Sequence, residues 1–141
     1  MNRRFLIAWL VLFVAWYVGS FVVHGLLLHA DYEPLVGRLF RAPDEARPYF
    51  PLMVVAHLLM AGAFVWIYAR GVEPKPWAGQ GVRYGAAIAA LMIVPLYLIY
   101  FVVQPMPAST VVKQVVYETI LVLLLGLLAA YMYRSAGSKP G

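Results

Sequence analysis

Three ionisable side chains stand within long apolar stretches of this 141-residue sequence: His24, His57 and Glu118. Imidazole and carboxyl groups can exchange protons, coordinate metal ions and form strong hydrogen bonds. Such groups are costly inside a bilayer, usually face the interior of a helix bundle, and mark a functional site by default. We therefore place the candidate site around these three residues.

Further polar side chains fall in the same layer as these three: Ser20, Gln114, and the i, i+3, i+7 stripe of Tyr97, Tyr100 and Gln104 on another apolar stretch. Ser20 precedes His24 by four residues, so the two share one helix face. Gln114 precedes Glu118 by the same interval. With a rise of 1.5 Å per residue, His24, His57 and Glu118 lie about 6, 10 and 12 Å below the outer boundary. The sequence thus predicts one polar layer in the outer half of the membrane, in which His57 and Glu118 meet and His24 assists.

Three interpretations of this layer stay open. In the first, Glu118 is protonated, bonds to His57 or a tyrosine, and only holds the helices together, at about 0.6–2 kcal/mol per hydrogen bond. In the second, His24, His57 and Glu118 are ion ligands, since two imidazoles and a carboxylate suit zinc or ferrous iron. A haem held by His24 and His57 is a variant of that interpretation, although no cofactor is required by the sequence. In the third, His57 and Glu118 titrate together along a proton or small-solute path.

Four stretches are long and apolar enough to cross a bilayer, which takes roughly 20 residues. They cover residues 5–28, 50–69, 84–103 and 110–133. Backbone groups in lipid must be satisfied within each segment, so the expected fold is all-α. We predict a single membrane domain, a transmembrane bundle of four helices with antiparallel neighbours, an outer loop 29–49 and an inner loop 70–83. Pro95, inside the third stretch, predicts a kink.

Composition and charge agree with this location. The chain is 64% hydrophobic and 12% charged, which excludes an ordinary soluble domain and a disordered one. If the N-terminus is inside, seven Lys and Arg lie on the cytoplasmic side and four outside, which accounts for all eleven. The positive-inside rule therefore places the N- and C-termini in the cytoplasm. We attribute the net charge of +5 to contacts with anionic lipid and expect no nucleic-acid partner.

The glycines are interpreted as structural. The run from Gly79 to Gly85 lacks the strand and βαβ unit of a dinucleotide site, so it predicts a turn. The glycines within the expected spans form no repeated GxxxG, which favours close helix contact over a dimerisation motif.

Six segments of the chain share a pattern with known sequences: HGLLLHADY (24–32), YFPLMVVAHLL (49–59), WIYARG (66–71), GQGVRYG (79–85), VPLYLIYFVVQPMP (94–107) and GLLAAYMYR (126–134). In these segments the chain resembles a family of small bacterial four-span membrane proteins of unknown function. The resemblance covers most of the chain and implies a multi-pass protein of the bacterial inner membrane. It carries over no catalytic or ligand residue.

No serine lies in a plausible array with a histidine and an acid, so we expect no enzyme. The leading hypothesis is a non-enzymatic membrane protein in contact with the lipid bilayer. It acts alone, as a homo-oligomer, or as an accessory subunit packed against a membrane-protein partner in a larger complex. The alternative is an ion or metal binding or transport protein that uses His57 and Glu118, with His24 assisting.

Overall fold

The computed structural model describes residues 2–134. Within them, four helical stretches are long and apolar enough to cross a membrane: Arg3–Leu27, Pro43–Arg70, Trp77–Val103 and Ala108–Tyr133. The same residues form no β-strand, only an isolated bridge between Val36 and Phe40. The predicted all-α bundle of four helices is confirmed, and the chain is a multi-pass membrane protein.

Two of the four spans contain a π-helical segment. The first span is α1 (Arg3–Ser20) followed by the π-helical η1 (Phe21–Leu27), and the second consists mainly of α4 (Phe50–Arg70). The third is α5 (Trp77–Ile88), the π-helical η4 (Ala89–Ile93) and α6 (Val94–Val103), and the fourth is α7 (Ala108–Tyr133). Short helical turns occupy the expected outer loop: α2 (His29–Tyr32), η2 (Glu33–Leu35), α3 (Pro43–Ala46) and η3 (Arg47–Tyr49).

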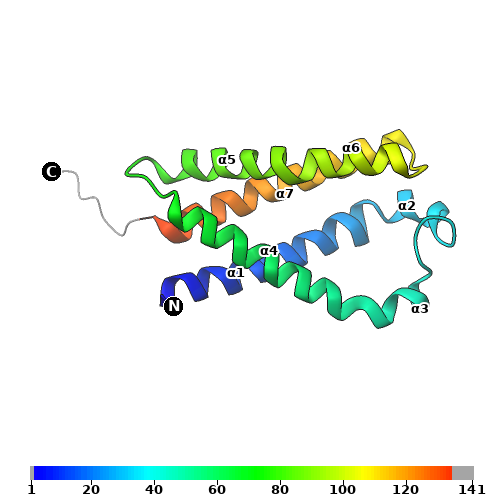
Figure 1. Ribbon diagram of the computed structural model, residues 1–141, viewed down its shortest axis with the longest axis horizontal. Coiled ribbons are helices and arrows are strands. Elements are labelled where there is room, and N and C mark those ends of the chain that lie inside the picture. Colours follow the sequence, from blue (N-terminus) through cyan, green and yellow to red (C-terminus); the bar gives the residue numbers. More distant parts are fainter. Residues whose placement is uncertain (1, 135–141) are drawn as a thin grey trace.

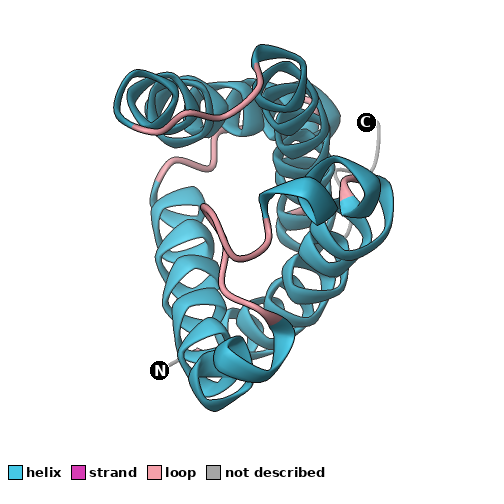
Figure 2. Cartoon of the chain, turned by 90° about the vertical axis from the view of Figure 1, so that its right-hand side faces the viewer, coloured by secondary structure: helices cyan, strands magenta, loops and turns pink. Residues whose placement is uncertain are grey.

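The spans pack as two pairs. α1 packs mainly against α4, α5 packs against α7, and contacts between α1 and α7 join the pairs. In Figure 1, α1 and α4 cross and are farthest apart near α2 and α3. Viewed from that end, the four spans stand around a common centre (Figure 2). At the opposite end, Arg4 donates to the backbone oxygens of Met132 and Arg134, at 2.9 and 2.7 Å. The start of the first span therefore lies beside the end of the last span.

The apolar core lies in the half of the bundle nearer these ends. Trp16 on α1 packs edge-on against Phe64 on α4, with ring centroids 5.4 Å apart. The Tyr84 hydroxyl on α5 donates to the backbone oxygen of Phe64 at 2.7 Å. In contrast, many large apolar side chains point outward, and Leu91 is 71% exposed. Such an outer surface suits lipid rather than water.

The third span starts earlier than the sequence predicts. It begins at Trp77 rather than near residue 84, so the expected turn from Gly79 to Gly85 is helical. A Cβ atom on Gly81 would lie 2.7 Å from the backbone oxygen of Gly126. The absence of side chains therefore lets the backbones of α5 and α7 touch, as small residues do between membrane helices. Gly81 and Gly85 form a GxxxG pair, which our sequence reading missed because it placed Gly81 in a loop.

Pro95 disturbs the third span as expected, and the disturbance takes the form of a π-helical segment. Proline lacks a backbone N–H and its ring clashes with the carbonyl four residues earlier. That carbonyl belongs to Leu91, which lies within η4. The wider π turn next to Pro95 precedes the restart of regular helix at α6.

Candidate functional site

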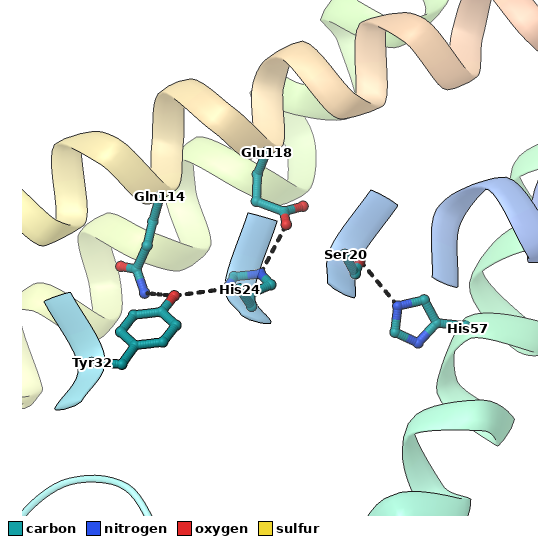
Figure 3. A network of polar contacts seen from close by, with 6 residues as sticks. All are labelled: Ser20, His24, Tyr32, His57, Gln114 and Glu118. Atoms are coloured by element: carbon teal, nitrogen blue, oxygen red, sulfur yellow. Dashed lines mark hydrogen bonds and ion pairs between the residues drawn. The ribbon is translucent and has the colours of Figure 1, made fainter. Parts of the chain in front are cut away.

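The first and last spans are joined by a contact between two ionisable side chains. His24 on η1 places Nε2 2.8 Å from Oε1 of Glu118 on α7 (Figure 3). Glu118 is only 5% exposed, whereas the His24 side chain is 36% exposed. The distance is that of an ion pair, but His24 and Glu118 are not aligned for a hydrogen bond. Glu118 Oε1 is therefore buried without a hydrogen-bond donor among the described residues.

Tyr32 from the short helix α2 extends this pair toward the connecting loop. Its hydroxyl lies 2.7 Å from His24 Nδ1, and the two rings are stacked. Gln114 Nε2 donates to the same hydroxyl at 3.0 Å. Because the Tyr32 oxygen accepts the hydrogen bond from Gln114, we assign the hydroxyl proton of Tyr32 to the bond with His24 Nδ1, which then accepts. His24 then carries its own proton on Nε2, facing the carboxylate of Glu118.

The environment of Tyr32 favours this donor role. Burial raises the pKa of Tyr32 to about 12; the bond from Gln114 acts in the opposite direction, and the carboxylates of Glu118 and Asp31 add to the increase. The phenol therefore stays protonated at neutral pH. Lys113 on α7 binds both carboxylate oxygens of Asp31, at 2.8 and 3.0 Å, which holds α2 and its tyrosine against α7.

His57 on α4 forms a second polar group, with Ser20 of α1. Its Nδ1 lies 2.7 Å from the backbone oxygen of Met53, one turn earlier on α4. A carbonyl can only accept, so Nδ1 carries the proton. Nε2 lies 3.1 Å from the Ser20 hydroxyl and accepts from it when the ring is neutral. Tyr17 packs edge-on against the imidazole and fixes its plane.

Both polar groups border one cavity of about 570 Å³. It lies among α1, η1, α4, η4, α6 and α7, and its lining is mostly aromatic rings and methionines. The full lining is Trp16, Tyr17, Ser20, Phe21, His24, Gly25, Tyr32, Met53, His57, Met60, Met92, Ile93, Leu96, Tyr97 and Glu118. A second cavity, of about 280 Å³, shares Trp16, Met60 and Met92 with the first and continues toward Phe64 and Ile67.

The structure distributes the predicted site residues unequally. His57 and Glu118 border the same cavity but bond to different partners, so the direct contact expected between them is replaced by the contact of Glu118 with His24. Tyr97 also lines this cavity. Tyr100 lies beside a neighbouring cavity of about 250 Å³, together with Gln114 and Gln104.

Tyr32 is the site residue that the sequence reading missed. No helical period connects a residue of the outer loop to the spans, so the spacing of the polar side chains did not indicate it. The one sequence signal is the acidic residue before it, Asp31, whose charge finds a partner in Lys113.

The contacts of the two histidines argue against metal ligation. His24 and His57 each have both ring nitrogens in contact with another group. Binding a metal ion or haem would break at least one of these contacts. Within the described residues, no three His, Asp or Glu side chains are arranged to hold a metal ion.

No protein-family model, curated protein or solved structure matches this chain. The resemblance to small bacterial four-span proteins therefore stays a prediction. What the protein does has to be argued from the cavity and its polar groups.

Proposed function

We propose that this chain is a non-enzymatic, multi-pass protein of the bacterial inner membrane that binds a small, largely apolar molecule within the bundle. The observation that carries the proposal is the cavity of about 570 Å³ with His24, His57 and Glu118 on its wall. Ligand sites in proteins are typically of this size, mostly apolar, and furnished with a few convergent polar groups.

Unused hydrogen-bonding capacity supports binding over a purely structural role. Glu118 Oε1 and Gln114 Oε1 are both buried without a hydrogen-bond partner among the described residues. An unsatisfied buried acceptor costs about 1–3 kcal/mol, so a layer that served only to join helices would be expected to satisfy both. A bound molecule with a donor group would compensate Glu118 directly, because that residue lines the cavity.

The packing of the other half of the bundle argues against a transport path. Leu12, Val65 and Val122 are fully buried in the core between the cavity and the chain ends. A proton or ion path would need polar groups or water through this region. We therefore propose that the cavity is a binding site and not one end of a channel. By the distribution of basic residues, it faces the outer leaflet.

Two neighbouring residues provide a matched test. Met92 is 41% exposed and lines both cavities, whereas Leu91 on the same helical segment is 71% exposed and lines neither. Met92→Trp is expected to fill the cavity, and Leu91→Trp adds the same side chain to the lipid-facing surface. The wild type and both variants are purified from native membranes in mild detergent, and their bound small molecules are extracted and identified by mass spectrometry.

We expect one compound at equal amounts in the wild type and Leu91→Trp, and its loss from Met92→Trp. Identical extracts from all three proteins would overturn the proposed function. Circular dichroism of each variant checks that the helices are retained.

A further inference from the structure

From the shape and chemistry of the two adjacent cavities, we infer that the ligand is a lipid with an uncharged ring head bearing hydroxyl donors, the chemistry of a prenylated hydroquinone. The inference rests on the proposed function, since it names the class of molecule that the same site takes. It is carried by three features: an apolar extension for a tail, a head region without cationic side chains, and aromatic walls with two separate polar groups.

The tail follows from the second cavity. It shares Trp16, Met60 and Met92 with the first and is lined otherwise by apolar side chains of α4 and α5. These are Leu59, Ala63, Phe64, Ile67 and Ile88. From His57 to Ile67, α4 advances about 15 Å, which gives the length available to an apolar chain. A compact ligand would fill only the first cavity, whereas a lipid occupies both.

The charge of the head follows from the side chains that face it. Glu118 is the one acid on the wall, His24 and His57 can be neutral, and no lysine or arginine of the described chain lines either cavity. Lys113, the one lysine or arginine within Ala108–Tyr133 of α7, is bound by Asp31 instead. A phosphate or carboxylate head would have no cation to bind, and would meet repulsion from Glu118. The site therefore favours an uncharged head.

The shape of the head follows from the walls. Five aromatic side chains surround the first cavity, and its three methionines are flexible, polarisable contacts for a flat ring. The side chains that line it with aromatic rings are Trp16, Tyr17, Phe21, Tyr32 and Tyr97.

Polar contacts are available at two points along the first span, one on α1 and one on η1. The Ser20 hydroxyl belongs to the His57 group, and His24 belongs to the Glu118 group (Figure 3). Residues four apart on a helix have Cβ atoms about 6 Å apart, so the two groups can meet two oxygens on opposite edges of one ring. The Ser20 hydroxyl donates its proton to His57 Nε2, so toward a ligand its oxygen can only accept, and Glu118 Oε1 is a buried acceptor without a hydrogen-bond partner among the described residues. Two hydroxyl groups on one ring match these two acceptors, whereas a simple alcohol offers only one donor.

The test compares two probes with a similar apolar tail. Decylubiquinol, kept reduced under anaerobic conditions, has a ring head with two hydroxyl groups, and dodecanol has a single hydroxyl. Each is added to delipidated protein in detergent, and the amount retained after gel filtration is quantified by extraction. The proteins are the wild type, Met92→Trp as the cavity-filling variant, and Leu91→Trp as its matched surface control.

We expect the wild type and Leu91→Trp to retain one decylubiquinol per chain and to bind it at least about tenfold more tightly than dodecanol, a difference of about 1.4 kcal/mol. Met92→Trp should retain neither probe. If the wild type binds dodecanol as tightly as the hydroquinone, or binds only dodecanol, the hydroquinone inference fails and the proposed binding function stands. If neither probe is retained, the hydroquinone inference fails, and the extraction experiment described above decides separately whether the site binds another molecule. The comparison of the two probes on the wild type needs no variant, so misfolding of Met92→Trp would not leave the inference untested.

Discussion

The imidazole of His24 and the carboxyl group of Glu118 meet at 2.8 Å and so join η1 in the first span to α7 in the last. His24 lies in a π-helical segment, a deviation that is frequent at functional sites. Tyr32 and Gln114 orient the imidazole from its other nitrogen. The pair therefore forms one wall of the cavity and fixes the position of two spans at once.

We expect measurable energetic coupling between His24 and Glu118. In a double-mutant cycle with His24→Gln and Glu118→Gln, the coupling energy should be about 0.6–2 kcal/mol, the range for polar contacts between membrane helices. The free energy of unfolding is measured by SDS titration in mixed micelles. His29, exposed at the start of α2, is the control histidine, and His29→Gln should show no coupling to Glu118→Gln. Coupling near zero in the first cycle would mean that the contact contributes nothing to stability.

The close contact of α5 and α7 predicts a position-dependent cost of adding one methyl group. Gly81→Ala places a Cβ atom 2.7 Å from the backbone oxygen of Gly126 and 2.9 Å from Leu127 Cα. Overpacking of this kind costs about 1–3 kcal/mol in unfolding free energy. Gly79→Ala is the matched control, because nothing lies within 4 Å of its Cβ position. If the two variants unfold alike, the helices do not touch through Gly81.

The environment of Tyr32 predicts a delayed ionisation at high pH. Its pKa is raised from 10.0 to about 12, mainly by burial, so the folded protein holds this proton more tightly than the unfolded chain. The corresponding contribution to stability is complete below pH 10 and disappears as the pH rises through about 12. The phenolate absorbance of the wild type minus that of Tyr32→Phe should therefore rise with a midpoint near pH 12. A midpoint at the ordinary value of 10.0 would place Tyr32 in water.

Much of the fold follows from the sequence because the membrane restricts the choices. Apolar length fixes the number of spans, and the need to satisfy backbone groups without water makes them helical. This reasoning did not predict where the third span starts. The segment from Trp77 to Arg83 is helical, although its glycines and its charge are typical of a connection, because Gly81 packs against Gly126. That contact joins residues distant in sequence, so no local pattern reveals it.

The site could be predicted in composition but not in pairing. His24, His57, Glu118 and Tyr97 all line one cavity, as the expectation of a single polar layer implies. Which histidine meets Glu118 depends on how the spans rotate about their axes and on the wider π-helical turns of η1, with their i→i+5 hydrogen bonds. Helical spacing alone does not determine either. Tyr32 enters the site from a connecting helix, where side-chain periodicity gives no information.

The central claim is that one small molecule occupies the cavity beside His24 and Glu118, and native mass spectrometry tests it most directly. The protein is released from native membranes in a mild detergent, and the intact mass is recorded for the wild type, Leu91→Trp and Met92→Trp. We predict that the wild type and Leu91→Trp carry the same additional mass at one copy per chain, and that Met92→Trp has the mass of the polypeptide alone. A wild-type mass equal to that of the bare chain, or an additional mass that persists in Met92→Trp, would contradict the account.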